Sequence, residues 1–156
     1  MAIAEQPGAK TEPQASVFDL IGAPLLSSGM TDNTVAKTDN LVGRLKIYAE
    51  GGENALHTHL REDHVFLVLA GQATFYVGRE ERAQVVEKFQ GVMLPAGAFY
   101  RFHSTGDENL VMFRVGAGKV PGQDDRTGPS GAPLPGGSKE NKITPGVIAE
   151  GKFFTA

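Results

Sequence analysis

The chain has 156 residues, enough for one domain with a single core, and its 40% apolar and 21% charged residues are ordinary for a globular protein. It contains no Cys, which excludes disulfides, thiolate metal sites, iron–sulfur clusters and cysteine nucleophiles. The net charge is −3, and no basic run or aromatic–basic interleaving occurs, so we expect no nucleic-acid partner.

The start of the chain predicts little regular structure. Residues 1–15 are polar and contain Pro and Gly, and we expect a flexible N-terminal segment there. The apolar segment Val17–Leu26 fits either a strand or one helical turn, because Gly22 and Pro24 argue against a long helix.

A series of short strands is expected in the middle of the chain. In residues 42–49, for example, Leu45 and Ile47 fall on one face while Arg44 and Lys46 fall on the other, which is the period of a strand. The expected strands are 42–49, 55–59, 64–70, 72–77, 85–89, 91–97, 100–104 and 110–115. The expected turns are 49–54, 60–63, 78–84 and 105–109, with a tight hairpin at 70–72. Many short strands with little helix predict an all-β sandwich or barrel.

The C-terminal part has a different character. Residues 116–142 are dense in Gly, Pro and polar residues, which permits a disordered tail. Apolar residues return in residues 143–154, however, so we expect the extension 117–156 to pack on its own barrel or on a partner subunit. The barrel domain itself is expected to span residues 16–116.

Three of the four histidines cluster at positions 57, 59 and 64. Residues i and i+2 of a strand face the same side, so His57 and His59 project together, and the turn at 60–63 brings His64 to the next strand. We expect these two strands to form an antiparallel pair, on which three neutral imidazoles converge on one divalent metal ion.

The segment from Gly51 to Gly71 resembles the first cupin motif, which runs Gly, five residues, His-x-His, three or four residues, Glu, six residues, Gly. Every spacing fits, but His64 stands where the family has its Glu ligand. The resemblance implies a double-stranded β-helix (cupin or jelly-roll) barrel, here with extended N- and C-terminal segments.

The stretch from Phe89 to Ser104 resembles the second cupin motif and keeps its Pro-x-Gly core as Pro95 and Gly97. Tyr100 replaces the family's His ligand. The resemblance therefore implies a metal site of His57, His59, His64 and Tyr100, with Tyr100 either a phenolate ligand or a catalytic proton donor or acceptor beside the metal.

Three other residues are rival ligands. Strand alternation sends His103 to the face opposite Tyr100, so we do not expect it at the metal unless a bulge intervenes. A one-residue change of register brings Glu62 or Asp63 to the metal, but the spacing from Gly71 favours His64. We therefore expect both acids in a solvated turn.

This set of ligands is more electropositive than the family's usual three His and one Glu, and it attracts anionic substrates. The favoured hypothesis is a metal-dependent oxidoreductase, dioxygenase-like, that acts on a small organic acid, diketone or phenolic substrate. The favoured metal is Fe²⁺, with Zn²⁺, Ni²⁺ or Mn²⁺ as alternatives. The alternative hypotheses are a redox-neutral lyase or isomerase and a non-catalytic small-molecule-binding protein.

We expect a small-molecule substrate and a homodimer, because a small barrel has strand edges that the long terminal segments can cover in a partner. No stretch approaches the roughly 18 apolar residues of a membrane span. The N-terminus lacks the apolar core of a signal peptide. A cytoplasmic protein without a membrane partner is the resulting expectation.

Overall fold

The computed structural model describes residues 12–50, 54–118 and 124–155. No helix occurs among these residues, which confirms the all-β prediction, and none of them forms a segment of the kind that crosses a membrane as an apolar helix. The strands are β1 (Pro24–Ser28), β2 (Met30–Lys37), β3 (Leu41–Tyr48), β4 (Thr58–His59), β5 (Glu62–Ala70), β6 (Ala73–Val77), β7 (Arg82–Val86), β8 (Gly91–Leu94), β9 (Tyr100–Ser104), β10 (Leu110–Gly118), β11 (Arg126–Thr127) and β12 (Val147–Phe153).

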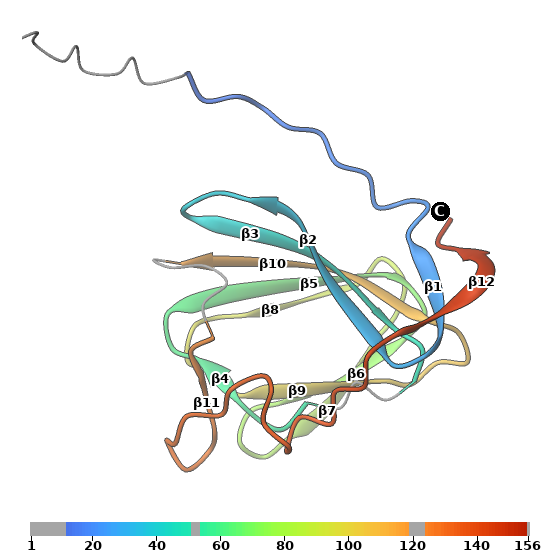
Figure 1. Ribbon diagram of the computed structural model, residues 1–156. Helices are drawn as coiled ribbons and strands as arrows, with labels where there is room; N and C mark the ends of the chain where they lie inside the picture. The colour runs from blue at the N-terminus through green and yellow to red at the C-terminus, as the bar shows by residue number, and fades with distance from the viewer. Residues whose placement is uncertain (1–11, 51–53, 119–123, 156) are drawn as a thin grey trace, which may run out of the picture.

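Two antiparallel sheets make up the body of the fold. The larger has the strand order β2-β3-β10-β5-β8, and the smaller has the order β7-β6-β9 (Figure 1). Two short pairs, β11 with β4 and β1 with β12, lie beside them. β2 and β3 are consecutive in sequence, but β10 is inserted between β3 and β5, so these neighbours in the large sheet are distant in sequence.

Both faces of the large sheet carry a buried cluster. Its inner face packs against an aromatic cluster in which Phe75 contacts Phe66 and Phe102, with ring centroids 5.4 and 5.1 Å apart. Its outer face carries a second buried cluster, made of Leu26, Leu45, Ile47, Val111 and Phe154. Because the outer face is apolar, the alternate side chains Arg44 and Lys46 of β3 point into the barrel.

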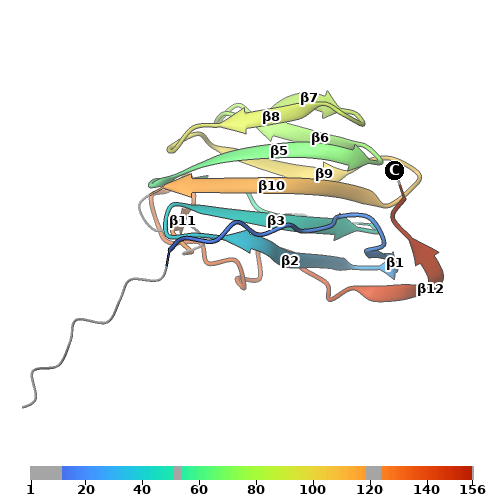
Figure 2. The same ribbon diagram turned by 90° about the horizontal axis from the view of Figure 1, so that it is seen from above.

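The terminal segments contribute to this outer layer. In Figure 2 the N-terminal segment crosses over the large sheet, where the ring of Phe18 stacks on Phe113 with 5.8 Å between centroids. The C-terminal strand β12 pairs with β1, and the backbone N–H of Phe154 donates to the carbonyl of Ala23 at 2.9 Å. Of the predicted flexible segment 1–15, residues 1–11 lie outside the described residues.

Several predicted boundaries are wrong. No strand is predicted where β2 lies, and β4 is much shorter than the predicted strand 55–59. The predicted strand 85–89 is shifted to β7, and Phe89 instead has a positive φ of 67°. The predicted hairpin at Gly71 is wrong, because β5 and β6 belong to different sheets and do not pair. The chain does turn tightly there: the φ of Gly71 is +72°, and a Cβ would overlap the carbonyl of Asn109, so only Gly fits.

Candidate metal centre

The three clustered histidines reach the barrel interior from separate backbone elements. His59 ends β4, which pairs with β11, whereas His64 lies in β5, which pairs with β10 and β8. The predicted antiparallel pairing of the two histidine strands is therefore wrong. The chain nonetheless turns so that the rings of His59 and His64 face each other with 4.3 Å between centroids.

His57 precedes β4 and is completely buried. Its Nδ1 lies 2.8 Å from the carbonyl oxygen of Ala55, to which it donates its proton, and this leaves the lone pair on Nε2. That Nε2 is buried without a hydrogen-bond partner among the described residues. Burial lowers the pKa of His57 to about 3, so the ring is neutral at pH 7 and its orphaned Nε2 is suited to a metal ion.

His59 has the same tautomer for a different reason. Its Nδ1 donates to Oδ1 of Asp125 at 2.6 Å, while Oδ2 of Asp125 accepts the backbone N–H of Arg61 at 3.1 Å. Burial, followed by the nearby His64, lowers the pKa of His59 to about 4. A carboxylate that holds Nδ1–H and presents Nε2 is the usual support of a metal-binding histidine.

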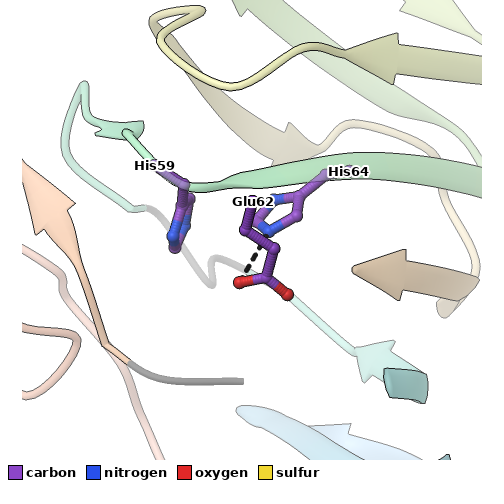
Figure 3. Close-up of side chains that lie close together, drawn as sticks. All are labelled: His59, Glu62 and His64. Atoms are coloured by element: carbon purple, nitrogen blue, oxygen red, sulfur yellow. Dashed lines mark ion pairs between the residues drawn. The ribbon is translucent and has the colours of Figure 1, made fainter. Parts of the chain in front are cut away.

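Glu62 is the main correction to the predicted ligand set. It lies in β5 two residues before His64, on the same face, with only 3% of its surface exposed, so the expectation of a solvated turn is wrong. Its Oε2 is 3.3 Å from Nε2 of His64 (Figure 3). Ligand atoms of His59, Glu62 and His64 all lie within 4.8 Å of one another, close enough to share one ion.

Asp63, the other acid of the predicted turn, is exposed and points away from the site. One of its carboxylate oxygens accepts the backbone N–H of Ala96 at 2.7 Å. His103 also faces away, on the outer side of the small sheet, where it contacts Arg101 at 2.7 Å and the ring of Tyr76.

His64 is tied to its neighbours through both ring nitrogens. Arg114 in β10 donates to its Nε2, and a nitrogen of the same guanidinium lies 3.3 Å from Glu62. Burial lowers the pKa of His64, so the ring is neutral and its Nδ1–H donates to the hydroxyl of Tyr100 at 3.1 Å. His64 can bind a metal ion through Nε2 only if Arg114 moves from that nitrogen.

Tyr100 lies at the start of β9 and is 3% exposed. Its ring centroid is 4.5 Å from that of His57. Burial raises the pKa of Tyr100 to about 12, so the hydroxyl keeps its proton at neutral pH unless a cation displaces it. The side chain is placed to donate or accept a proton beside the histidines.

A cavity of about 280 Å³ opens beside this group of residues. It has apolar walls formed by Met30, Phe66, Phe102 and Ile143. Its charged lining consists of four cations, Arg44, Lys46, Arg114 and Arg126, and three carboxylates, Asp32, Glu62 and Asp124. The cavity is therefore cationic before any metal is added, which suits a small anion.

Sequence reasoning missed the cations and Asp125. One signal was available for Arg114, which interrupts the apolar run Leu110–Val115 at a position that alternation places inside. A second signal was the Asp124-Asp125-Arg126 triplet, three consecutive charges in a Gly- and Pro-rich segment that otherwise predicts a loop.

Residues 44–116 match the sequence profile of the cupin domain. This segment is a cupin domain. The match covers β3 to β10, which include His57, His59, His64 and Tyr100, whereas Asp125 and Arg126 lie beyond it. The first Gly of the first cupin motif, Gly51, lies outside the described residues.

Solved structures with the same fold support this assignment. The protein TT1209 from Thermus thermophilus is 20% identical, with a TM-score of 0.53 over 58% of this chain and 84% of that one. A Klebsiella pneumoniae protein with a double-stranded β-helix domain is 18% identical, with a TM-score of 0.56 over 64% and 86%. KdgF from Halomonas sp. is 20% identical, with a TM-score of 0.52 over 62% and 83%.

These likenesses confirm the predicted double-stranded β-helix, and at such identities they concern the fold alone. No curated protein sequence matches the chain significantly.

Proposed function

We propose that this cupin is a metal-dependent oxidoreductase, dioxygenase-like, that uses Fe²⁺ to oxidise a small anionic substrate such as an organic acid, a diketone or a phenol. The observation that carries the proposal is the grouping of His59, Glu62 and His64, two imidazoles and one carboxylate within 4.8 Å. A set of two histidines and one carboxylate with open positions is typical of non-haem Fe²⁺ oxygenases.

In this proposal His57 is a further ligand, because its Nε2 is buried and unpartnered among the described residues. Bound Fe²⁺ would supply the oxygen chemistry. The chain itself would hold a proton on the Tyr100 hydroxyl, 3.1 Å from His64, and deliver it to or take it from the substrate. Phe66 and Phe102 would keep water from the substrate's apolar part.

The buried Tyr100 hydroxyl, 3.1 Å from Nδ1 of His64, also supports a second candidate, a redox-neutral lyase or isomerase. A buried, protonated phenol next to a metal-polarised substrate is a suitable general acid, and such a reaction requires no oxygen. A third candidate is a non-catalytic cupin that binds the small molecule without converting it.

Oxygen consumption distinguishes these candidates. The protein is loaded anaerobically with Fe²⁺ or Zn²⁺ and then mixed with small carboxylic acids, diketones and catechols in air. Oxygen uptake only in the Fe²⁺ form, lost in His59→Ala, would support the dioxygenase. Turnover in the Zn²⁺ form without oxygen uptake would instead support the lyase or isomerase, and binding without turnover in either form would support the non-catalytic candidate.

The proposal includes a homodimer. Val65 in β5 and Met93 in the edge strand β8 are directly paired, and they remain 43% and 58% exposed on the outer face of the large sheet. An apolar edge of this kind is normally covered. Light scattering at micromolar concentration should give the mass of two chains, and a monomeric mass would contradict this part of the proposal.

A further inference from the structure

A cluster of charges lies at the end of the cavity formed by β2 and β3. Lys46 is nearly buried, with its side chain 9% exposed, and its Nζ is 2.6 Å from Oδ2 of Asp32. Arg44 reaches the other oxygen of Asp32, with its Nη1 at 3.3 Å from Oδ1. Two cations thus share one carboxylate, so one positive charge has no counter-charge within this cluster.

The cavity also contains unused hydrogen-bond donors. The Nε–H groups of Arg44 and Arg126 are buried and have no hydrogen-bond partner among the described residues. Both arginines line the cavity. Buried donors without partners are costly, and those in a cationic cavity are suited to an anion that enters from solvent.

The cluster is separate from the candidate metal ligands. Lys46 pairs with Met112 of β10, whereas Gly116 of the same strand pairs with His64. The offset of four residues corresponds to about 13 Å along the strand. Phe66 and Arg114, which are paired across β5 and β10, lie at an intermediate position and line the same cavity.

We propose that Lys46 and Arg44 form a second anion subsite that binds a carboxylate of the substrate at the end away from the metal, whereas Arg126 lies opposite His59. This inference rests on the proposed function and names its substrate class: a small acid with a carboxylate at one end and a metal-binding oxygen group at the other. The short apolar part between them lies against Phe66 and Phe102.

Calorimetric titration with glutarate and pentanoate, which differ by one carboxylate, tests the subsite. Metal-free protein should bind glutarate, and Lys46→Met should weaken this binding by about tenfold or more, as expected for the loss of one charge-assisted contact. In the Zn²⁺ form, glutarate should bind about tenfold more tightly than pentanoate, and Lys46→Met should abolish this preference.

The matched control is Lys37→Met, which removes an exposed lysine at the end of β2 and should leave both affinities unchanged. Arg44 is less buried than Lys46, so Arg44→Met provides a second variant if Lys46→Met does not fold. Unchanged glutarate affinity in a folded Lys46→Met or Arg44→Met protein would overturn the subsite. The affinities are measured on the metal-free protein and on the redox-inert Zn²⁺ form. They therefore test the subsite even if the Fe²⁺ form consumes no oxygen and the proposed function fails.

Discussion

Asp125 accepts a hydrogen bond from Nδ1 of His59 at 2.6 Å, although 66 residues separate the two in sequence. Backbone pairing of β11 with β4, which sets Arg126 opposite His59, brings the carboxylate there. A residue beyond the matched cupin segment therefore fixes the tautomer of a candidate ligand inside it.

Replacement of Asp125 by Asn should weaken metal binding by about 10–100-fold, because the amide no longer orients His59 or raises the basicity of its Nε2. Competition with a chromogenic chelator measures this affinity for Zn²⁺. The control is Asp63→Asn, which alters an exposed carboxylate that also accepts a backbone N–H. An equal loss in both variants would contradict the role of Asp125.

Removal of the candidate histidine ligands should be more severe. His57→Ala and His59→Ala should each lower the metal content of the purified protein to a small fraction of one ion per chain, because both imidazoles present Nε2 to the interior. Elemental analysis gives the metal content. His103→Ala is the matched control, since His103 lies on the outer face, and it should retain the metal.

Retained metal in His57→Ala with loss in His59→Ala would restrict the site to His59, Glu62 and His64. The structure allows this smaller site, because the ligand atoms of His59, Glu62 and His64 lie within 4.8 Å of one another and His57 is not part of that group.

The sequence predicted the strands around His57, His59 and His64 because apolar alternation and motif spacing are local properties. It did not predict the position of Glu62, which depends on where β5 begins. Two consecutive acids such as Glu62 and Asp63 can occur in a turn or at the start of a strand. Only the pairing of Glu62 with Gly118 of β10 shows that they belong to the strand.

The two cations of the cavity lining that come from β3 could not be predicted, for another reason. Alternation in β3 separates Arg44 and Lys46 from Leu45 and Ile47, and a charged face is normally the solvent face. Here the termini cover the apolar face with Leu26 and Phe154, and the charged face lines the cavity. This inversion depends on segments that are distant in sequence.

Tyr100→Phe separates the two roles predicted for Tyr100. Phe keeps the ring that packs on His57 but removes the hydroxyl 3.1 Å from His64. If the hydroxyl transfers a proton, metal affinity should stay within a few-fold of wild type while turnover falls by about 10²–10⁴-fold. A large loss of metal affinity would identify Tyr100 as a ligand instead.

Titration of Lys46 should make anion binding depend on pH. Burial lowers its pKa to about 8, with Asp32 opposing the shift and Arg114 and Arg126 adding to it. Binding of glutarate to metal-free protein should therefore weaken as pH rises through 8. The Lys46→Met variant should lack this pH dependence.

The same titration can be followed without ligand, through stability. Between pH 8 and 10.5 the unfolded chain keeps the Lys46 proton and the folded chain loses it, so the free energy of unfolding should rise with pH. The full contribution is on the order of 3 kcal/mol. Urea denaturation at pH 7 and pH 9.5 should show about 2 kcal/mol of this contribution, because pH 9.5 is still below the unfolded-state pKa of 10.5. An equal change in Lys46→Met would assign it to other groups.

Gly116 is required for the position of Glu62. It lies opposite His64 in β10, and a Cβ on it would overlap the Glu62 carboxylate and approach Arg114 at 3.1 Å. Its backbone conformation suits any residue, so Gly116→Ala acts only through this overlap. We expect displacement of Glu62 from Arg114 and His64, a loss of about 1–3 kcal/mol of stability, and weaker metal binding.

Gly137→Ala is the control, because a Cβ there meets no atom within 4 Å. The double variant Gly116→Ala with Glu62→Gln tests the route of the effect. If Gly116→Ala acts by displacing the carboxylate, its cost in metal affinity should shrink once Glu62 has lost its charge, and the two effects should not add. Full additivity would mean that Gly116→Ala does not act through the Glu62 carboxylate and that Gly116 serves only the packing of β10.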